Sequence, residues 1–192
     1  MKAVKKILNN IFIDGLSGMA LGLFSTLIIG TILKQIGDLM GGTYGGYLST
    51  FAIIAQRLTG AGIGIGVAYK FKESTYVLLS AAAAGMIGAY ASNLIAGTLL
   101  SEQGALVLLG PGEPLGAFVA AYVGITVGRL VAGKTKLDLL ITPAVTILSG
   151  GAVGILVGPG VSRFMTWLGD LVNWGTEQQP ILMGIVVSVI MG

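Results

Sequence analysis

The chain contains no cysteine and no histidine, so neither a disulfide framework nor a thiolate or imidazole metal site can form. The same absence excludes cysteine nucleophiles and phosphoryl carriers or proton relays built on histidine. We therefore expect no metal, no cofactor and no catalytic residue. Charge is scarce as well: charged residues make up 10% of the 192 positions, against about 25% in soluble domains. So few charges cannot cover a surface that faces water, which indicates a protein that faces lipid.

Glycine and apolar residues are in excess. The hydrophobic fraction is 54%, and 32 residues are glycine. Glycine enrichment without a collagen repeat is typical of membrane helices that pack closely. No basic stripe is interleaved with aromatic residues, so nucleic-acid binding is a poor interpretation. The lipid bilayer is the expected partner.

Long runs without charge predict an all-α integral membrane protein, a polytopic glycine-rich helix bundle formed by residues 1–192 as a single membrane domain. A β-barrel would need strands of about 10 residues with alternating polarity, which these runs lack. The last run begins at Pro180 and stops about 18 Å later, at 1.5 Å per residue. We therefore expect a truncated sixth span and a longer parent protein. Five full spans are predicted before it, at 12–33, 46–69, 75–100, 115–132 and 139–161.

The basic residues are distributed unequally over the loops between these spans. Only Lys34 and Arg163 fall on one side. Because cytoplasmic loops are enriched in lysine and arginine, this bias predicts a cytoplasmic N-terminus and a multi-pass protein of the cell membrane. The basic residues on the other, cytoplasmic side are Lys2, Lys5, Lys6, Lys70, Lys72, Arg129, Lys134 and Lys136.

Glycines recur at helical spacing in several of the predicted spans. Such stripes let helix backbones approach closely, and in lipid it is packing that drives helix association. Close packing is the interpretation that we favour over direct contact with a solute. The glycines predicted to pack helices together are Gly18, Gly22, Gly60, Gly64, Gly85, Gly88, Gly150, Gly154 and Gly158.

The stretch RLTGAGIGIG, from Arg57 to Gly66, contains four alternating glycines. Its spacing does not match the G-x-G-x-x-G of a dinucleotide-binding loop. In a helix the glycines form two interleaved i, i+4 pairs that leave a broad side bare for another helix. Arg57 is costly inside a membrane and needs an acid or a polar cavity, with Asp14 and Glu113 as candidate partners. The alternative is that residues 39–57 lie at the membrane surface, with Arg57 reaching the headgroups.

The segment LLGPGEPLGA, from Leu108 to Ala117, contains Pro111 and Pro114 on either side of Glu113. Two prolines and three glycines disfavour a regular helix. If this loop dips into the membrane, Glu113 could meet a polar solute; the alternative is an ordinary extracellular turn. Asn93, inside a long apolar run, is a weaker candidate. The predicted substrate-binding residues are therefore Arg57, Glu113, Asp14 and Asn93.

Three segments carry a family resemblance: GGYLSTFAIIAQRLTGAGIGIGVAYKFK, LGPGEPLGAFVAAYVG and LLITPAVTILSGGAVGILVGPGV. They resemble the phosphotransferase-system IIC-like membrane proteins, specifically the group named for the perfringolysin O regulator. The resemblance spans nearly the whole chain. It implies a permease domain, a homodimer, a sugar or other small polar solute as ligand, and phosphotransferase-system components as partners.

The chain departs from the sugar-transporting members of this family in one respect. It lacks their membrane histidine and their Gly-Ile-Thr-Glu-like motif. Coupled phosphorylation of the sugar therefore depends on other chains or on residues outside this sequence. Three functions remain open: a solute permease of the IIC type, a membrane sensor or regulator that binds a solute or partner without transporting it, and, as the weakest of the three, a channel.

Overall fold

The computed structural model describes residues 10–178, together with 184 and 188. These residues form helices and no strands, so the predicted all-α class is confirmed. The two η segments are π-helical and continue directly into the α-helices beside them. The elements in chain order are η1 (Asn10–Gly15), α2 (Leu16–Leu23), η2 (Phe24–Ile28), α3 (Ile29–Met40), α4 (Gly42–Arg57), α5 (Thr59–Lys70), α6 (Thr75–Ala89), α7 (Ala91–Ile95), α8 (Pro114–Val131) and α9 (Asp138–Gln178).

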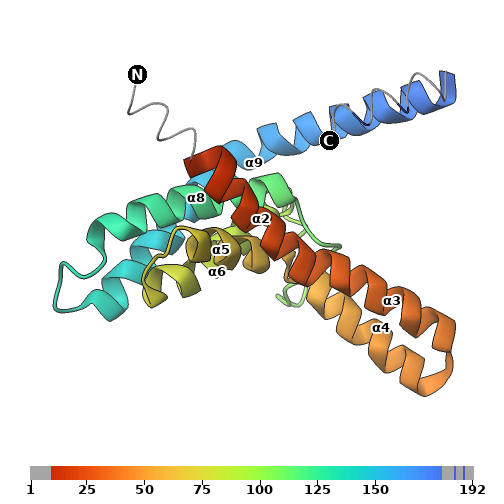
Figure 1. The fold of residues 1–192 in the computed structure, drawn as a ribbon, viewed down its shortest axis with the longest axis horizontal. Coiled ribbons are helices and arrows are strands. Elements are labelled where there is room, and N and C mark those ends of the chain that lie inside the picture. Colours follow the sequence, from red (N-terminus) through yellow and green to blue (C-terminus); the bar gives the residue numbers. More distant parts are fainter. Residues whose placement is uncertain (1–9, 179–183, 185–187, 189–192) are drawn as a thin grey trace.

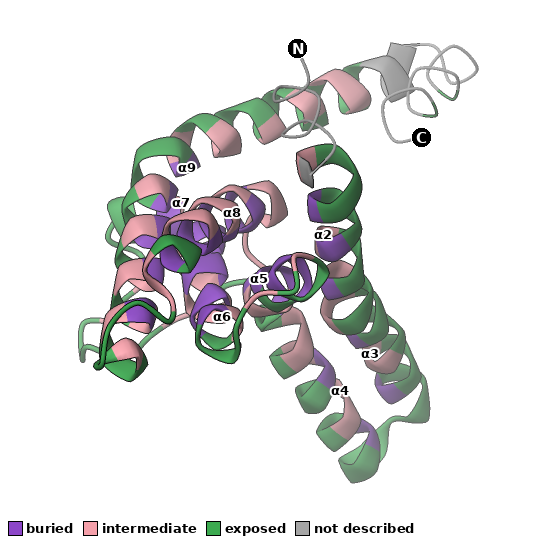
Figure 2. Cartoon of the chain, turned by 60° about the vertical axis from the view of Figure 1, so that its left-hand side comes forward, coloured by how far each residue is buried: buried purple, intermediate pink, exposed green. Residues whose placement is uncertain are grey.

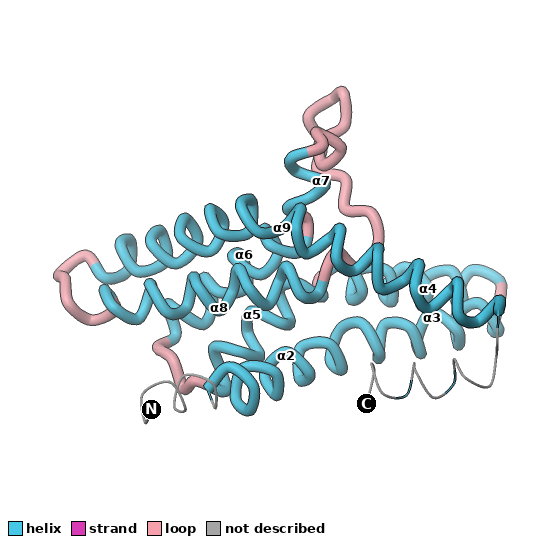
Figure 3. The backbone as a smooth tube through the Cα atoms, turned by 90° about the horizontal axis from the view of Figure 1, so that it is seen from above, coloured by secondary structure: helices cyan, strands magenta, loops and turns pink. Residues whose placement is uncertain are grey.

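A central bundle carries two projecting arms (Figure 1). The bundle contains α2, α5, α6, α8 and the first half of α9. One arm is the hairpin of α3 and α4, and the other is the second half of α9. Seen from above, the loop between α8 and α9 lies at the opposite end of the molecule from the hairpin tip (Figure 3).

Three helical stretches are long and apolar enough to cross a membrane: Ile11–Met40, Pro114–Val131 and Asp138–Trp174. The pair α4 and α5 makes a fourth if it is counted as one span, although it bends by 53°. Most buried residues gather in the bundle, whereas the arms are mainly exposed or intermediate, with a few buried positions where α3 faces α4 (Figure 2). Large apolar side chains such as Phe24, Phe51 and Leu156 lie among the exposed ones, as expected of a protein solvated by lipid.

The predicted count of five spans is not confirmed within the described residues. The segment 75–100, predicted as one helix, is interrupted after fifteen residues of α6. Fifteen residues extend about 22 Å, less than the roughly 30 Å hydrocarbon core. Hydropathy overlooked this break because Tyr90, Ser92 and Asn93 lower the average only slightly. The sixth span, predicted from Pro180, lies outside the described residues.

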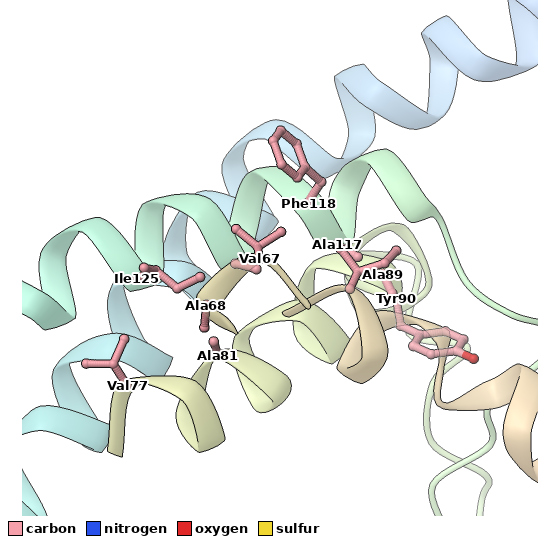
Figure 4. Packing of buried hydrophobic residues seen from close by; sticks show 11 residues of the cluster. Val67, Ala68, Val77, Ala81, Ala89, Tyr90, Ala117, Phe118 and Ile125 are labelled. Atoms are coloured by element: carbon pink, nitrogen blue, oxygen red, sulfur yellow. The ribbon is translucent and has the colours of Figure 1, made fainter. Parts of the chain in front are cut away.

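The core is built from small side chains on α5, α6 and α8 (Figure 4). Glycine makes the close approach possible. A β-carbon added at Gly64 would collide with the Ala81 carbonyl on α6, and one at Gly66 would collide with the Gly18 carbonyl on α2. The alternating glycines of α5 therefore serve two neighbours: Gly60 and Gly64 face α6, whereas Gly62 and Gly66 face α2.

The other glycines predicted to pack also lie at helix contacts. A β-carbon at Gly88 would meet the Gly116 carbonyl on α8, and one at Gly154 would approach Gly88 on α6. At Gly154 a side chain would fit only if its neighbours shift slightly, whereas Gly88 leaves too little room for one, so the backbones there define how close the helices lie. The same holds at Gly18, Gly22, Gly85, Gly150 and Gly158.

Candidate functional site

The first element of the site is the bend between α4 and α5 at Leu58. A bend frees backbone carbonyls that a continuous helix would pair, and in lipid each of these needs a donor. The hydroxyl of Thr59, which is fully buried, donates to the Gln56 carbonyl at 2.6 Å. The Tyr90 hydroxyl lies 3.3 Å from the Arg57 carbonyl. The Thr59 hydroxyl therefore supplies a hydrogen bond at the bend, and the Tyr90 hydroxyl lies close to a second carbonyl there.

The second element is the interruption between α6 and α7 at Tyr90. This side chain is 2% exposed, and its ring reaches away from the alanine-rich core (Figure 4). Its hydroxyl donates to the Gly110 carbonyl at 2.6 Å. A phenol has one proton, so this shorter bond is the stronger of its two contacts. Tyr90 thus connects the α4–α5 bend to the loop that precedes α8.

The third element is the loop before α8. Gly110 and Gly112 have φ angles of 68° and 75°, a left-handed conformation that favours glycine. The backbone N–H of Glu113 donates to the Ala89 carbonyl at the end of α6, at 2.7 Å. Gly112 packs directly on Ala89, where a β-carbon would come within 2.8 Å of the Ala89 side chain. The loop is therefore docked into the α6–α7 interruption rather than extended away from the bundle.

These contacts bring three chain interruptions together at one place, which we call the junction and define by Arg57, Tyr90, Gly110 and Glu113. The Glu113 carboxyl is partly buried there at the start of α8. Within the described part of the chain, it has no ion pair or side-chain hydrogen bond.

Of the two acids predicted to be near Arg57, Glu113 lies at the junction and Asp14 does not. Arg57 is exposed at the end of α4, and its backbone carbonyl lies 3.3 Å from the Tyr90 hydroxyl. The ion pairs found among the described residues do not include it. Asp14 is remote from the bend. Thr26 contacts Thr59 beside the bend. Asp14 comes twelve residues before Thr26 on the same helical stretch, which is about 18 Å of helix. The structure therefore places Arg57 and Glu113 at the junction and Asp14 away from it.

Asn93 does not belong to the junction core. It lies on α7, where its amide makes a long, 3.4 Å contact to the nearby Thr98 hydroxyl. Tyr90, by contrast, was not among the predicted site residues. The sequence did contain an indication of its role, since Tyr90 lies inside a long apolar run. A phenol buried in such a run needs a hydrogen-bond partner.

The opposite end of the bundle is basic. The loop before α6 and the loop after α8 meet there. The Arg129 guanidinium lies 3.8 Å from the Glu73 carboxylate. Burial raises the pKa of the Glu73 carboxyl, and the nearby charge of Arg129 partly offsets this effect. Lys70, Lys72, Lys134, Lys136 and Arg129 are all exposed near these loops.

Comparison with known proteins adds the family. No curated protein and no solved structure matches the chain. The family described as "Phosphotransferase system, EIIC" matches residues 13–192. This match covers nearly the whole chain and agrees with its membrane-capable helices. The protein therefore belongs to the phosphotransferase-system EIIC family, and it is a sugar transporter-like membrane domain.

Proposed function

We propose that this chain is a permease domain for a sugar or other small polar solute, acting as a transport subunit of a sugar phosphotransferase system. The observation that carries the proposal is the junction, where three interrupted helical segments meet inside a membrane bundle. Irregular backbone at membrane depth is tolerated where it is buried in protein or lines a polar path. Transporters commonly bind their solutes between such broken helices.

Glu113 and Arg57 supply the polar groups that a sugar requires. The Glu113 carboxylate can accept hydrogen bonds from sugar hydroxyls, and the Arg57 guanidinium can donate them. The Glu113 backbone is held by Ala89, so its carboxyl starts from a defined position. Phosphorylation of the sugar would fall to partner proteins, because this sequence has no histidine or cysteine to carry a phosphoryl group.

We further propose that the protein is multi-pass in the cell membrane, with a cytoplasmic N-terminus. The basic loops 71–74 and 132–137 would then face the cytoplasm, where arginine and lysine are enriched. In this arrangement the junction lies between the two membrane faces, within reach of a solute entering from outside. A homodimer and a sixth span from Pro180 remain predictions.

Uptake of labelled sugars into proteoliposomes tests the proposal, with and without phosphotransferase partners. We expect Glu113→Gln or Arg57→Gln to weaken binding and uptake by about tenfold or more, since hydrogen bonds to charged groups contribute about 1.5–3 kcal/mol. Lys136→Gln, at the basic end, is the matched control and should leave uptake unchanged.

Two results would contradict this function. Equal uptake by all three variants would show that the junction is not the solute site. No uptake of any sugar, combined with measurable sugar binding, would favour the sensor or regulator instead.

A further inference from the structure

An open cavity of about 460 Å³ lies between α7 and the second half of α9, and none of the four residues that define the junction lines it. Helix α7 packs against α9 at Gly158, where a β-carbon would approach Ala91 within 2.6 Å. Beyond this contact the two helices leave the cavity between them. Cavities of this size are typical of small-molecule sites. Its lining residues are Ser92, Ile95, Ala96, Pro159, Ser162, Arg163, Thr166, Trp167 and Asp170.

The apolar stretch Asp138–Trp174 is longer than a membrane needs, so its second half, which lines the cavity, can extend beyond the bilayer. This helix has 41 residues, or about 61 Å, whereas the hydrocarbon core is about 30 Å thick. If the span begins near Asp138, it ends about 20 residues later, near Gly158. The second half of α9 then projects from the bundle as an arm (Figure 1), so a solute in water can reach the cavity.

The polar face of this arm is turned toward the protein. Arg163, Thr166 and Asp170 follow one another at i, i+3 and i+7, which places them on one side of the helix. All three line the cavity opposite Ser92 of α7. Within the described residues, neither the Arg163 nor the Asp170 side chain has an ion pair or a hydrogen bond. Two unpaired charges that face a cavity are groups available to a ligand.

An aromatic surface completes the site. Trp167 stacks with Phe164 at a centroid distance of 6.2 Å and an interplanar angle of 26°. Trp167 is 57% exposed at the cavity. A flat indole next to hydroxyl-binding groups suits a sugar ring, whose C–H face is apolar and whose edge carries hydroxyls.

We propose that this cavity is a second binding site, which captures a neutral sugar-like polyol at the outer end of the bundle. Trp167 contacts the C–H face of the ring, while Arg163 and Asp170 hydrogen-bond its hydroxyls. One cation and one anion leave the site without net charge, so it offers no net electrostatic attraction to an anionic or a cationic ligand. The choice of a sugar-like ligand rests on the proposed function; the location of the site rests on the cavity itself.

The two tryptophans of the chain, Trp167 and Trp174, allow a direct test. In the full chain with Trp174→Phe, Trp167 is the single tryptophan reporter. Neutral monosaccharides and disaccharides, including glucose and lactose, are titrated while its fluorescence is recorded. We expect a saturable change with a neutral sugar. Arg163→Gln or Asp170→Asn should raise the half-saturating concentration about tenfold or more. Glu102→Gln, which does not line the cavity, should leave it unchanged.

Several outcomes would overturn the inference. One is the absence of a saturable change with every neutral sugar in protein that elutes as a folded species. Another is tighter binding of glucose 6-phosphate than of glucose, and a third is unchanged affinity in both charge variants. Uptake measured in parallel separates this site from the proposed function. Uptake without any Trp167 response contradicts the second site alone, whereas a Trp167 response without uptake contradicts transport alone.

Discussion

At the scale of single residues, Tyr90 holds the junction together. Its hydroxyl donates to Gly110 and lies near the Arg57 carbonyl, so one side chain contacts two segments that are distant in the sequence. A buried carbonyl without a donor is costly in lipid, where water is absent. Tyr90 therefore stabilises the loop before α8 in its docked position, and with it the place of Glu113.

The substitution Tyr90→Phe removes this hydroxyl and little else. We expect it to lower the free energy of unfolding by about 1–3 kcal/mol, because the Gly110 carbonyl loses its donor. Chemical denaturation of the protein in detergent measures the change. Tyr47→Phe, at a side chain that is 59% exposed on α4, is the control. Equal stability of the two variants would show that the Tyr90 hydroxyl bond is not important.

At the scale of elements, α5 is packed between α2 and α6. Its two glycine pairs point to different neighbours, α6 and α2, so the helix is held between them. Packing of this kind depends on contact between backbones rather than on large side chains. Such helices tolerate little added volume, because a new methyl group must displace backbone atoms of a neighbouring helix.

Two glycine-to-alanine substitutions distinguish the effect of helix packing on stability from the effect of helix propensity. Gly64→Ala should destabilise the protein by about 1–3 kcal/mol, because the new β-carbon collides with the Ala81 carbonyl. Gly46 lies on α4, where an added β-carbon would meet no neighbouring atom within 4 Å. There the higher helix propensity of alanine should stabilise the protein by up to about 1 kcal/mol. Thermal unfolding in detergent measures both; a stabilising Gly64→Ala would contradict the packing described for α5.

At the scale of the whole molecule, basic residues gather at one end of α6 and α8. Loops 71–74 and 132–137 and the end of α8 carry the basic cluster with Lys70 and Arg129. The loop from α7 to α8 lies at the other end of α6 and α8, and so does the second half of α9. This polarity supports the proposed orientation, in which the basic end is cytoplasmic.

The absence of cysteine makes the orientation easy to measure, because any introduced thiol is the only one. A membrane-impermeant maleimide applied to intact cells should label Glu102→Cys and spare Lys136→Cys. Both positions should react after the membrane is permeabilised. Labelling of Lys136→Cys in intact cells would reverse the topology and would place the α7–α9 cavity on the cytoplasmic side.

Much of the architecture could be predicted because it depends on charge content and hydropathy summed over short stretches of the sequence. The scarcity of charge required a lipid solvent, and lipid leaves helices or closed barrels as the spanning structures. Hydropathy located the stretch 115–132, which the structure shows as α8, Pro114–Val131. Segment 75–100 was misread because an average over a window does not detect where a helix stops.

The sequence by itself determined the solvent, the helical class and the positions where glycine leaves a helix bare. Only the tertiary structure decided which helices fill those bare faces, that α4 and α5 bend by 53°, and that Tyr90 connects Arg57 to Gly110. The physical reason is the distance along the sequence over which each effect acts. Hydrophobicity and propensity act within a few turns of helix, whereas the junction and the α7–α9 cavity depend on residues brought together by packing from distant parts of the chain.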